Sequence, residues 1–326
     1  MTLHKILFSI FALFIVSKYY MRTTPISVKL PEPQFSLLGP YNTTEVIVED
    51  NYEQLIDINN FTFIHNPQPC KNYTAGLLLM VIVSSNPHHA DKRQIIRSTW
   101  GRNFDSTKVV FLIGETKNNT TVSKLVHKEI TEHGDIVYGN FKDAYRNLTY
   151  KHVMGLKWVK HHCPAARYVL KTDDDVLVNS GEMRHFLARE LSPWGAKDLI
   201  MCQVLKNAKA QRSSKSKWKV TTHEYSKQFY PTYCAGWAIL YSQDVIQRLL
   251  MAAQSIPYFW IDDVHITGIC AEMIGVPRTA LSSLILSQSR LKMVKLFGPQ
   301  STEPFIFGPP DLTSAGVKEL WEAIPE

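Results

Sequence analysis

Apolar stretches of two kinds alternate along the middle of the chain. Short continuous apolar runs that end in polar residues are typical of strands buried on both faces. Such runs occupy residues 77–85, 108–114, 135–141, 168–178, 198–205 and 237–241. Helical patterns lie between most of them, at residues 91–101, 121–133, 143–162, from 180 onward, 242–254 and 264–274. This alternation predicts an α/β fold, with a mostly parallel sheet and helices on both of its faces.

The N-terminal apolar block is of a different kind because it lies near the start of the chain and between basic residues. Residues 6–16 are almost entirely apolar, Lys5 precedes them, Lys18 follows them, and no small-x-small cleavage site comes after the block. These features favour an uncleaved signal-anchor over a cleaved signal peptide. We expect a cytoplasmic tail at 1–5, a transmembrane signal-anchor at 6–20, a proline-containing stem at 21–69 with some local order between Tyr52 and Phe63, and a folded body at 70–326.

Glycosylation signals indicate on which side of the membrane the body lies. Six Asn-x-Ser/Thr triplets follow the predicted anchor, beginning at Asn42, Asn60, Asn72, Asn118, Asn119 and Asn147. Such triplets are used in the lumen of the secretory pathway, so together they predict a lumenal body.

The five cysteines are Cys70, Cys163, Cys202, Cys234 and Cys270. None of them forms a Cys-x-x-Cys pair, which argues against a zinc site. Disulfides are permitted in a lumenal setting. The odd number leaves at least one thiol free or paired with another chain.

Three consecutive carboxylates, Asp173, Asp174 and Asp175, interrupt the apolar run at 168–178. Ionised carboxylates beside a core are costly unless they are paired or metal-bound, and Lys171 alone cannot pair with all three. Carboxylate oxygens suit Mg²⁺ and Mn²⁺, and ligands bind at strand ends in open α/β sheets. The triplet therefore predicts a divalent-cation site, with a solvated acidic turn as the alternative. An EF-hand is excluded, because Val178 stands where its loop requires glycine.

Basic residues give the chain a net charge of +7, which fits nucleic acid, an anionic membrane surface or phosphate-bearing ligands. No nucleic-acid-binding motif is present, so we expect no nucleic-acid partner. Arg93 and Arg97 lie four residues apart on one face of the helix at 91–101, where they could bind a diphosphate; salt bridging is the alternative. The basic stretch at 206–219 has no apolar period and predicts a mobile loop, either simply solvated or closing over a phosphate ligand.

A second acidic pair, Asp262 and Asp263, follows the aromatic residues at 258–260. Aromatic rings stack on the apolar faces of sugars, and carboxylates accept hydrogen bonds from sugar hydroxyls. The pair alone is weak support for a sugar site. His152 falls on the apolar face of the helix at 143–162, where a satisfied core residue is expected rather than a metal ligand.

Six ordered motifs resemble the inverting β-1,3-galactosyltransferase and β-1,3-N-acetylglucosaminyltransferase family, whose members are Golgi type II membrane enzymes that use UDP-sugars. The motifs are at residues 93–101, 111–114, 143–151, 171–176, 230–233 and 262–264. The resemblance implies a GT-A fold, which is a Rossmann-like sheet with the donor site at the strand ends. It also makes residues 70–326 the lumenal catalytic domain of a single-pass Golgi protein.

The resemblance implies roles for individual residues. Asp175 and Asp173 would hold Mn²⁺ against the diphosphate of the donor. Asp263 would take the proton from the acceptor hydroxyl as that hydroxyl attacks the anomeric carbon. The residues expected to bind the UDP-sugar are Arg93, Arg97, Asp173 and Asp174.

This sequence departs from the family pattern in three places. Cys202 stands where the family often has glycine. Together with proximity along the chain, the resemblance implies Cys70–Cys163 and Cys234–Cys270 disulfides, which leaves Cys202 as the free thiol. The strand after Tyr233 has fewer glycines than usual. The segment 263–268 has one residue more than the common spacing.

We expect the protein to move galactose from UDP-galactose to a sugar hydroxyl of a glycoprotein or glycolipid, forming a β-1,3 linkage with inversion. UDP-N-acetylglucosamine is the alternative donor, because Asp262–Asp263 resembles that group whereas Tyr233–Gly236 resembles the galactose-transferring group. A metal-dependent hydrolase and a non-catalytic lumenal sugar-binding protein are more distant alternatives. The expected partners are the UDP-sugar, the glycan acceptor and the Golgi membrane.

Overall fold

The computed structural model of the chain describes residues 35–39, 50–71, 77–102, 106–116, 120–301 and 303–324. The predicted cytoplasmic tail at 1–5 and signal-anchor at 6–20 lie outside these residues. No helix within the described ranges is long and apolar enough to cross a membrane.

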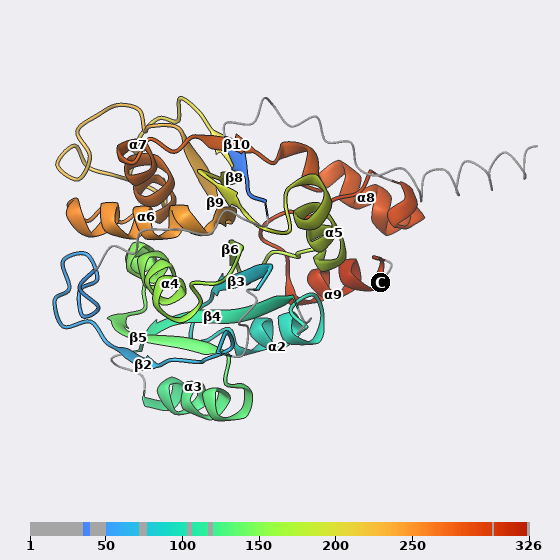
Figure 1. Cartoon of the computed structure of the whole chain (residues 1–326), viewed down its shortest axis with the longest axis horizontal. Coiled ribbons are helices and arrows are strands. Elements are labelled where there is room, and N and C mark those ends of the chain that lie inside the picture. Colours follow the sequence, from blue (N-terminus) through green and yellow to red (C-terminus); the bar gives the residue numbers. More distant parts are fainter. Residues whose placement is uncertain are drawn as a thin grey trace, which may run out of the picture.

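The described part of the chain is built around an eight-stranded sheet (Figure 1). Its strands, in spatial order, are β10 (Arg278–Ala280), β8 (Ile200–Leu205), β9 (Tyr233–Ser242), β6 (Tyr168–Asp173), β3 (Leu79–Ser84), β4 (Thr107–Glu115), β5 (Ile136–Lys142) and β2 (Phe63–His65). The central strands β6, β3, β4 and β5 run parallel to one another, whereas β9 and β2 are antiparallel to their neighbours. A separate two-stranded ladder joins β1 (Ser36–Leu37) to β7 (Ala196–Lys197).

Helices cover both faces of the sheet, as the apolar pattern predicts. One face packs against α4 (Leu148–His162), α6 (Gln243–Ser255) and α7 (Ala271–Met273). The other face packs against α2 (Ala90–Ser98), α3 (Thr120–His133), α5 (Ser180–His185), α8 (Gln288–Phe297) and α9 (Ser314–Glu322). The α/β prediction, with a mostly parallel sheet, is confirmed.

Strand β3 shows why the central runs are apolar throughout. Leu79, Val81 and Val83 belong to the core on one face, whereas Met80 and Ile82 belong to the core on the other face. Successive side chains of a strand point to opposite faces, so a strand covered on both sides is apolar along most of its length. In β3 the first polar residue is Ser84, at the end of the strand.

Part of the predicted stem belongs to the folded body. Strand β2 pairs with β5, and the carboxylate of Asp50 is fully buried between the ammonium groups of Lys157 and Lys160, at 2.6 and 2.5 Å. His161 also contacts Asp50, at 2.8 Å. Residues from Asp50 onward therefore pack against α4, and Asp50 neutralises the buried lysine of that helix.

The disulfides agree only partly with the sequence prediction. Cys70–Cys163 is present as expected, but the second bridge joins Cys202 to Cys234, and the free thiol is the buried Cys270. The predicted Cys234–Cys270 bridge and the free Cys202 are therefore wrong. The reason is that β8 and β9 are adjacent antiparallel strands, which brings Cys202 and Cys234 together across the ladder.

Candidate active site

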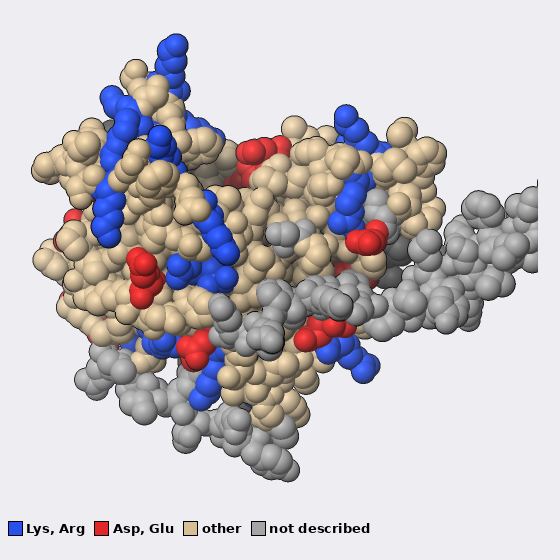
Figure 2. Space-filling model, turned by 90° about the horizontal axis from the view of Figure 1, so that it is seen from above, with Lys and Arg blue, Asp and Glu red and all other residues tan. Residues whose placement is uncertain are grey.

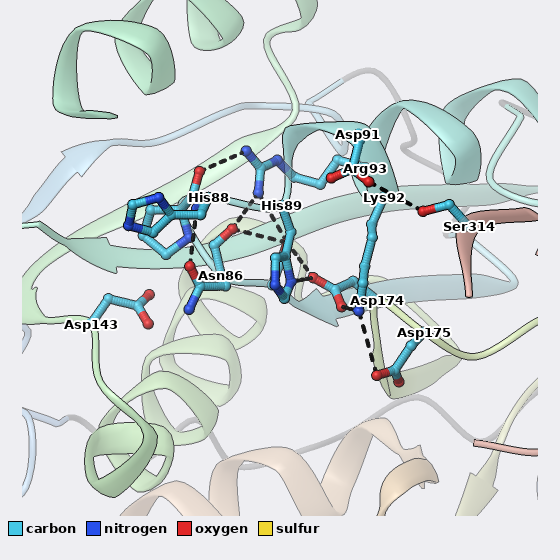
Figure 3. Close-up of polar contacts among 12 residues, drawn as sticks. Asn86, His88, His89, Asp91, Lys92, Arg93, Asp143, Asp174, Asp175 and Ser314 are labelled. Atoms are coloured by element: carbon cyan, nitrogen blue, oxygen red, sulfur yellow. Dashed lines mark hydrogen bonds and ion pairs between the residues drawn. The ribbon is translucent and has the colours of Figure 1, made fainter. Parts of the chain in front are cut away.

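The first half of the site lies where β3 and β6 end. Asp174, whose side chain is only 6% exposed, accepts hydrogen bonds from Ser85 Oγ at 2.8 Å, His89 Nδ1 at 2.8 Å and Lys92 Nζ at 3.1 Å (Figure 3). Burial opposes ionisation of Asp174, but these hydrogen bonds and the charges of His89 and Lys92 lower its pKa. Asp174 is therefore bonded to other side chains of the protein, and it fixes the end of β6 to the segment that leads into α2.

Asp173 and Asp175 are more open to solvent than Asp174. Their side chains are 37% and 27% exposed. Asp173 receives a hydrogen bond from Lys171 at 2.7 Å, and Asp175 lies 3.6 Å from Lys92. Burial raises the pKa of both carboxyl groups, and for Asp175 the charge of Asp173 adds to this rise. The two carboxylates thus need more positive charge than the neighbouring lysines provide.

This donor set fits a hard divalent cation. Carboxylate oxygens are the ligands that Mg²⁺ and Mn²⁺ prefer, and these ions are often bound by one or two carboxylates together with substrate phosphates. Among the described residues, no group of three or more His, Cys, Asp or Glu side chains is arranged to hold a metal ion. A cation at Asp173 and Asp175 would therefore need oxygens from a bound ligand to complete its coordination.

Arg93 and Arg97 are placed differently from the expectation. Arg93 is fully buried and forms a two-point ion pair with Glu129, at 2.8 and 2.6 Å. Arg97 forms the same kind of pair with Asp135, at 2.8 Å for both contacts. The structure therefore places both guanidiniums in buried or partly buried salt bridges. Salt bridging was the alternative to diphosphate binding. Arg93 also donates to Ser85 Oγ at 3.0 Å, so it supports the segment that holds Asp174.

The second half of the site contains Asp262 and Asp263. Asp262 is contacted by His152 Nδ1 at 3.0 Å and by Lys171 Nζ at 4.0 Å. Burial opposes ionisation of Asp262, but the charge of Lys171 and the hydrogen bond from His152 lower its pKa to about 2. Asp262 therefore carries a negative charge beside its neighbour.

Asp263 has the opposite electrostatic environment. Burial and the charge of Asp262 raise the pKa of Asp263 to about 7. Its Oδ1 accepts a hydrogen bond from the Val264 amide at 2.8 Å. A side chain at Gly236 would lie only 3.2 Å from the Asp263 Cβ, so this glycine leaves the room that Asp263 occupies.

Lys171 connects the two halves. Its ammonium donates to Asp173 at 2.7 Å and to the Gly236 carbonyl at 2.6 Å, and it lies 4.0 Å from Asp262. The exposed carboxylates at the end of β6 and the acidic pair thus belong to one site. The arrangement combines a place for a cation with a carboxyl group that can exchange a proton near neutral pH.

The helix that follows Asp263 has an unusual form. The backbone from Val264 to Cys270 forms a π-helix, whose wider turn accommodates one more residue than an α-helix over the same rise. Such segments occur frequently at functional sites. Here it begins directly after Asp263 and gives that residue its N-terminal capping position.

Aromatic residues line the side of the site next to Asp263. The rings of Tyr145 and Trp260 lie 6.1 Å apart, and the Arg146 guanidinium stands 4.3 Å over the Trp260 ring. Tyr145 is half-exposed, and its pKa is raised by burial and by the charges of Asp262, Asp263 and Asp173. Tyr145 is therefore close enough to the acidic pair to take part in ligand binding.

Sequence reasoning missed the residues that position the carboxylates. His89 and Lys92 hold Asp174, and the buried His152 holds Asp262 while its Nε2 contacts Tyr241 at 3.1 Å. The prediction that His152 is a satisfied core residue is confirmed. Its link to Asp262 crosses 110 residues of sequence, and no local pattern signals it.

Comparisons with known proteins agree with this geometry. The family model described as Galactosyltransferase matches residues 91–282. N-acetyllactosaminide beta-1,3-N-acetylglucosaminyltransferase 2 of Mus musculus is 37% identical over 233 residues, which are 69% of this chain and 55% of that protein. Beta-1,3-galactosyltransferase 5 of Homo sapiens is 32% identical over 226 residues, 68% of this chain and 71% of that protein.

The chain spans about half the length of the first of these relatives. Among solved structures, the galactosyltransferase LgtC in complex with donor and acceptor sugar analogs is similar, with a TM-score of 0.36 and 9% identity. That similarity covers 76% of this chain and 98% of LgtC.

Proposed function

The chain belongs to the galactosyltransferase family, and on this premise we propose that it transfers a hexose from a UDP-sugar to a glycan hydroxyl, forming a β-1,3 linkage with inversion. The observation that carries the proposal is the position of Asp263. Its carboxyl group has a pKa of about 7, and Lys171 links its neighbour Asp262 to the exposed carboxylates at the end of β6. A proton acceptor and a site for the leaving diphosphate thus lie together.

Asp263 is the general base of the proposed reaction. A general base works best when its pKa is near the working pH, and burial beside the charged Asp262 brings Asp263 there. A sugar hydroxyl is far less acidic than this carboxyl group, so the proton moves to Asp263 as the hydroxyl oxygen attacks the anomeric carbon. Attack from the face opposite the UDP group inverts that carbon.

Asp175 and Asp173 are the proposed ligands of Mn²⁺. When bound, the ion would neutralise negative charge that develops on the departing UDP. Lys92 and Lys171 contribute fixed positive charge at the same edge of the sheet. Asp174 acts indirectly by fixing the end of β6, and Arg93 and Arg97 support the neighbouring segment through their ion pairs with Glu129 and Asp135.

Galactose is the proposed donor sugar, with N-acetylglucosamine as the second candidate. Relatives named for each activity match the chain to a similar extent, at 32% and 37% identity. The proposed acceptor is a glycan on a glycoprotein or glycolipid. We also propose that the protein is a single-pass type II protein of the Golgi membrane with its catalytic domain in the lumen, on the strength of the apolar block at 6–16 and the glycosylation triplets.

One assay tests the proposed function. The purified full chain is incubated with Mn²⁺, a panel of UDP-sugars, and p-nitrophenyl β-galactoside or β-N-acetylglucosaminide as acceptor, and the products are identified by mass spectrometry and NMR. A β-1,3-linked disaccharide formed from one UDP-sugar is the expected result. Release of free sugar at the same rate without acceptor would indicate a hydrolase, and binding without turnover would indicate a sugar-binding protein.

A further inference from the structure

The positive charge of the protein is concentrated in the segment 206–229, which we call the basic loop. It contains seven Lys or Arg residues and one Glu, whereas the whole chain has a net charge of only +7. The rest of the chain is therefore nearly neutral. Figure 2, which looks down on the molecule, shows Lys and Arg side chains standing out in a group on the side where this loop lies in Figure 1.

The basic loop is held in place by its own hydrogen bonds. The Arg212 guanidinium donates to the carbonyls of Val220 at 2.8 Å, Tyr225 at 2.7 Å and Lys227 at 2.9 Å. Backbone hydrogen bonds join Ala210 to Gln228 at 2.9 Å and Val220 to Gln211 at 2.8 Å. Arg212 therefore stabilises the conformation of the loop. The lysine side chains are available to bind a ligand.

Among the residues that the structure describes, no carboxylate forms an ion pair with a lysine of the loop. Lys206, Lys209, Lys215, Lys217, Lys219 and Lys227 are all exposed. The only acidic residue of the loop, Glu224, pairs with Arg146 instead. Repulsion among exposed like charges destabilises a folded segment unless a ligand of opposite charge relieves it.

The basic loop stands on the side of the site that contains Asp263. Ala210 and Val220 share a small core with Trp260 and Val264, the residues that flank the acidic pair. Trp218 lies close enough to Tyr145 to influence the pKa of its hydroxyl, and the Lys217 ammonium lies 4.6 Å from the centre of the Trp218 ring. The loop therefore places Lys217 beside Trp218, next to the aromatic residue Tyr145 of the site.

We infer that the basic loop is an acceptor-recognition element and that the preferred acceptor is an anionic glycan, bearing a sulfate, phosphate or carboxylate group near the sugar that is extended. This inference rests on the proposed function. The exposed rings of Tyr145 and Trp218 provide stacking surface for a sugar, and Lys215, Lys217 and Lys219 provide the charge that selects it. The positive charge of these lysines attracts an anionic acceptor and repels a cationic one.

The test compares matched neutral and anionic acceptors with the full chain. The probes are p-nitrophenyl β-galactoside and β-N-acetylglucosaminide, each with its 6-O-sulfate and, for galactose, the corresponding uronic acid. We expect kcat/KM to be about tenfold higher for the anionic member of the preferred pair at low salt, since each exposed ion pair changes an equilibrium by about two- to fivefold. The preference should shrink as NaCl is raised from about 50 to 300 mM, because salt screens exposed charges.

Variants assign the preference to the loop. K215Q/K217Q/K219Q should reduce the anionic-to-neutral ratio to near one, whereas K215R/K217R/K219R should keep it. The matched control K124Q/K197Q/K292Q removes the same charge from exposed lysines on α3, β7 and α8 and should leave the ratio unchanged. Equal kcat/KM for the neutral and anionic acceptors of the wild type, or an unchanged ratio in the glutamine triple variant of the loop, would overturn the inference.

Two further measurements keep this inference separate from the proposed function. Equilibrium binding of the sulfated and unsulfated acceptors is measured by NMR titration without donor, so that selectivity can be seen even in a protein with no turnover. Selective binding without transfer would refute the proposed function and support the inference. If the loop variant instead raised KM for the UDP-sugar and left the acceptor ratio intact, the lysines would serve the donor and the inference would fail.

Discussion

Asp262 and Asp263 are consecutive residues with opposite acid–base behaviour. The charge of Lys171 and the hydrogen bond from His152 lower the pKa of Asp262 to about 2, whereas burial and the charge of Asp262 raise that of Asp263 to about 7. A pair of carboxyl groups whose environments separate their pKa values in this way indicates which one is the base. The first two predictions follow from this separation.

Asp263→Asn should preserve shape and hydrogen bonding but remove the proton acceptor. We expect kcat to fall about 100-fold or more while the affinity for UDP-sugar stays near that of the wild type. Steady-state kinetics and calorimetry on the full chain measure the two quantities. A near-normal kcat would end the assignment of Asp263 as the base, and a loss confined to acceptor KM would make it a binding residue.

The pH profile of kcat/KM should depend on the ionisation of Asp263. A base acts when it is deprotonated, and its raised pKa of about 7 means that activity falls as the pH drops below about 7. Asp262→Asn removes the adjacent negative charge, so the midpoint of its profile should move to lower pH. A midpoint that stays in place, or moves upward, would show that Asp262 does not tune Asp263.

Removal of Asp175 should weaken UDP binding only when Mn²⁺ is present. Asp175→Ala deletes one of the two exposed carboxylates that are the proposed ligands of the ion, so the diphosphate would face the remaining carboxylate without adequate neutralisation. Calorimetry with UDP, with and without Mn²⁺, measures the effect. Glu132→Ala on the exposed face of α3 is the control, and an Asp175→Ala affinity within about threefold of wild type would contradict the metal assignment.

Arg93 should matter for stability rather than for donor affinity. Arg93→Met removes the fully buried partner of Glu129 and leaves Arg97, at 2.8 Å, as its remaining partner, so the free energy of unfolding should fall by about 1.5–3 kcal/mol. The double variant Arg93→Met/Glu129→Leu should recover much of that loss, because no unpaired charge remains. Urea unfolding followed by fluorescence measures both variants. Unchanged stability with weaker UDP binding would restore the role in donor binding predicted from the sequence.

The Cys202–Cys234 bridge can be tested independently of activity. Peptide mapping of the unreduced full chain should find Cys202 linked to Cys234 and Cys270 as a thiol. Cys270→Ser should leave the map unchanged, whereas replacing both Cys202 and Cys234 by Ser should lower the free energy of unfolding by about 2–5 kcal/mol. A bridge that contains Cys270 would contradict the arrangement of β8 and β9 described above.

The apolar pattern was sufficient for the central sheet because each buried strand there is bounded by polar residues. Residues 135–141, for example, were predicted as a strand and form β5 at Ile136–Lys142. The pattern did not reveal β2, because Phe63–His65 is only three residues long and becomes a strand by pairing with β5. Short edge strands depend on their neighbours rather than on their own sequence.

Residues of the candidate site could be predicted where neighbouring residues in the sequence form the chemical group. They could not be predicted where their contacts depend on how distant segments pack. The Asp173–Asp175 triplet and the Asp262–Asp263 pair were found because adjacent carboxylates in apolar surroundings are unusual. The helical spacing of Arg93 and Arg97 correctly placed them on one face, but it could not show that this face points inward toward Glu129 and Asp135. The bridge between Cys202 and Cys234 was missed for the same reason, since strand order is a property of the whole sheet.

The burial of Asp50 has a practical consequence for producing the protein. A recombinant fragment that starts at Cys70 would lack this carboxylate and would leave the fully buried ammonium of Lys157 without a counter-ion. Loss of one partner of a buried pair costs about 3–5 kcal/mol, which is a large share of the stability of an ordinary domain. Secretion vectors for the soluble enzyme should therefore fuse their leader upstream of Asp50, and low yield from shorter fragments would reflect misfolding rather than an inactive catalyst.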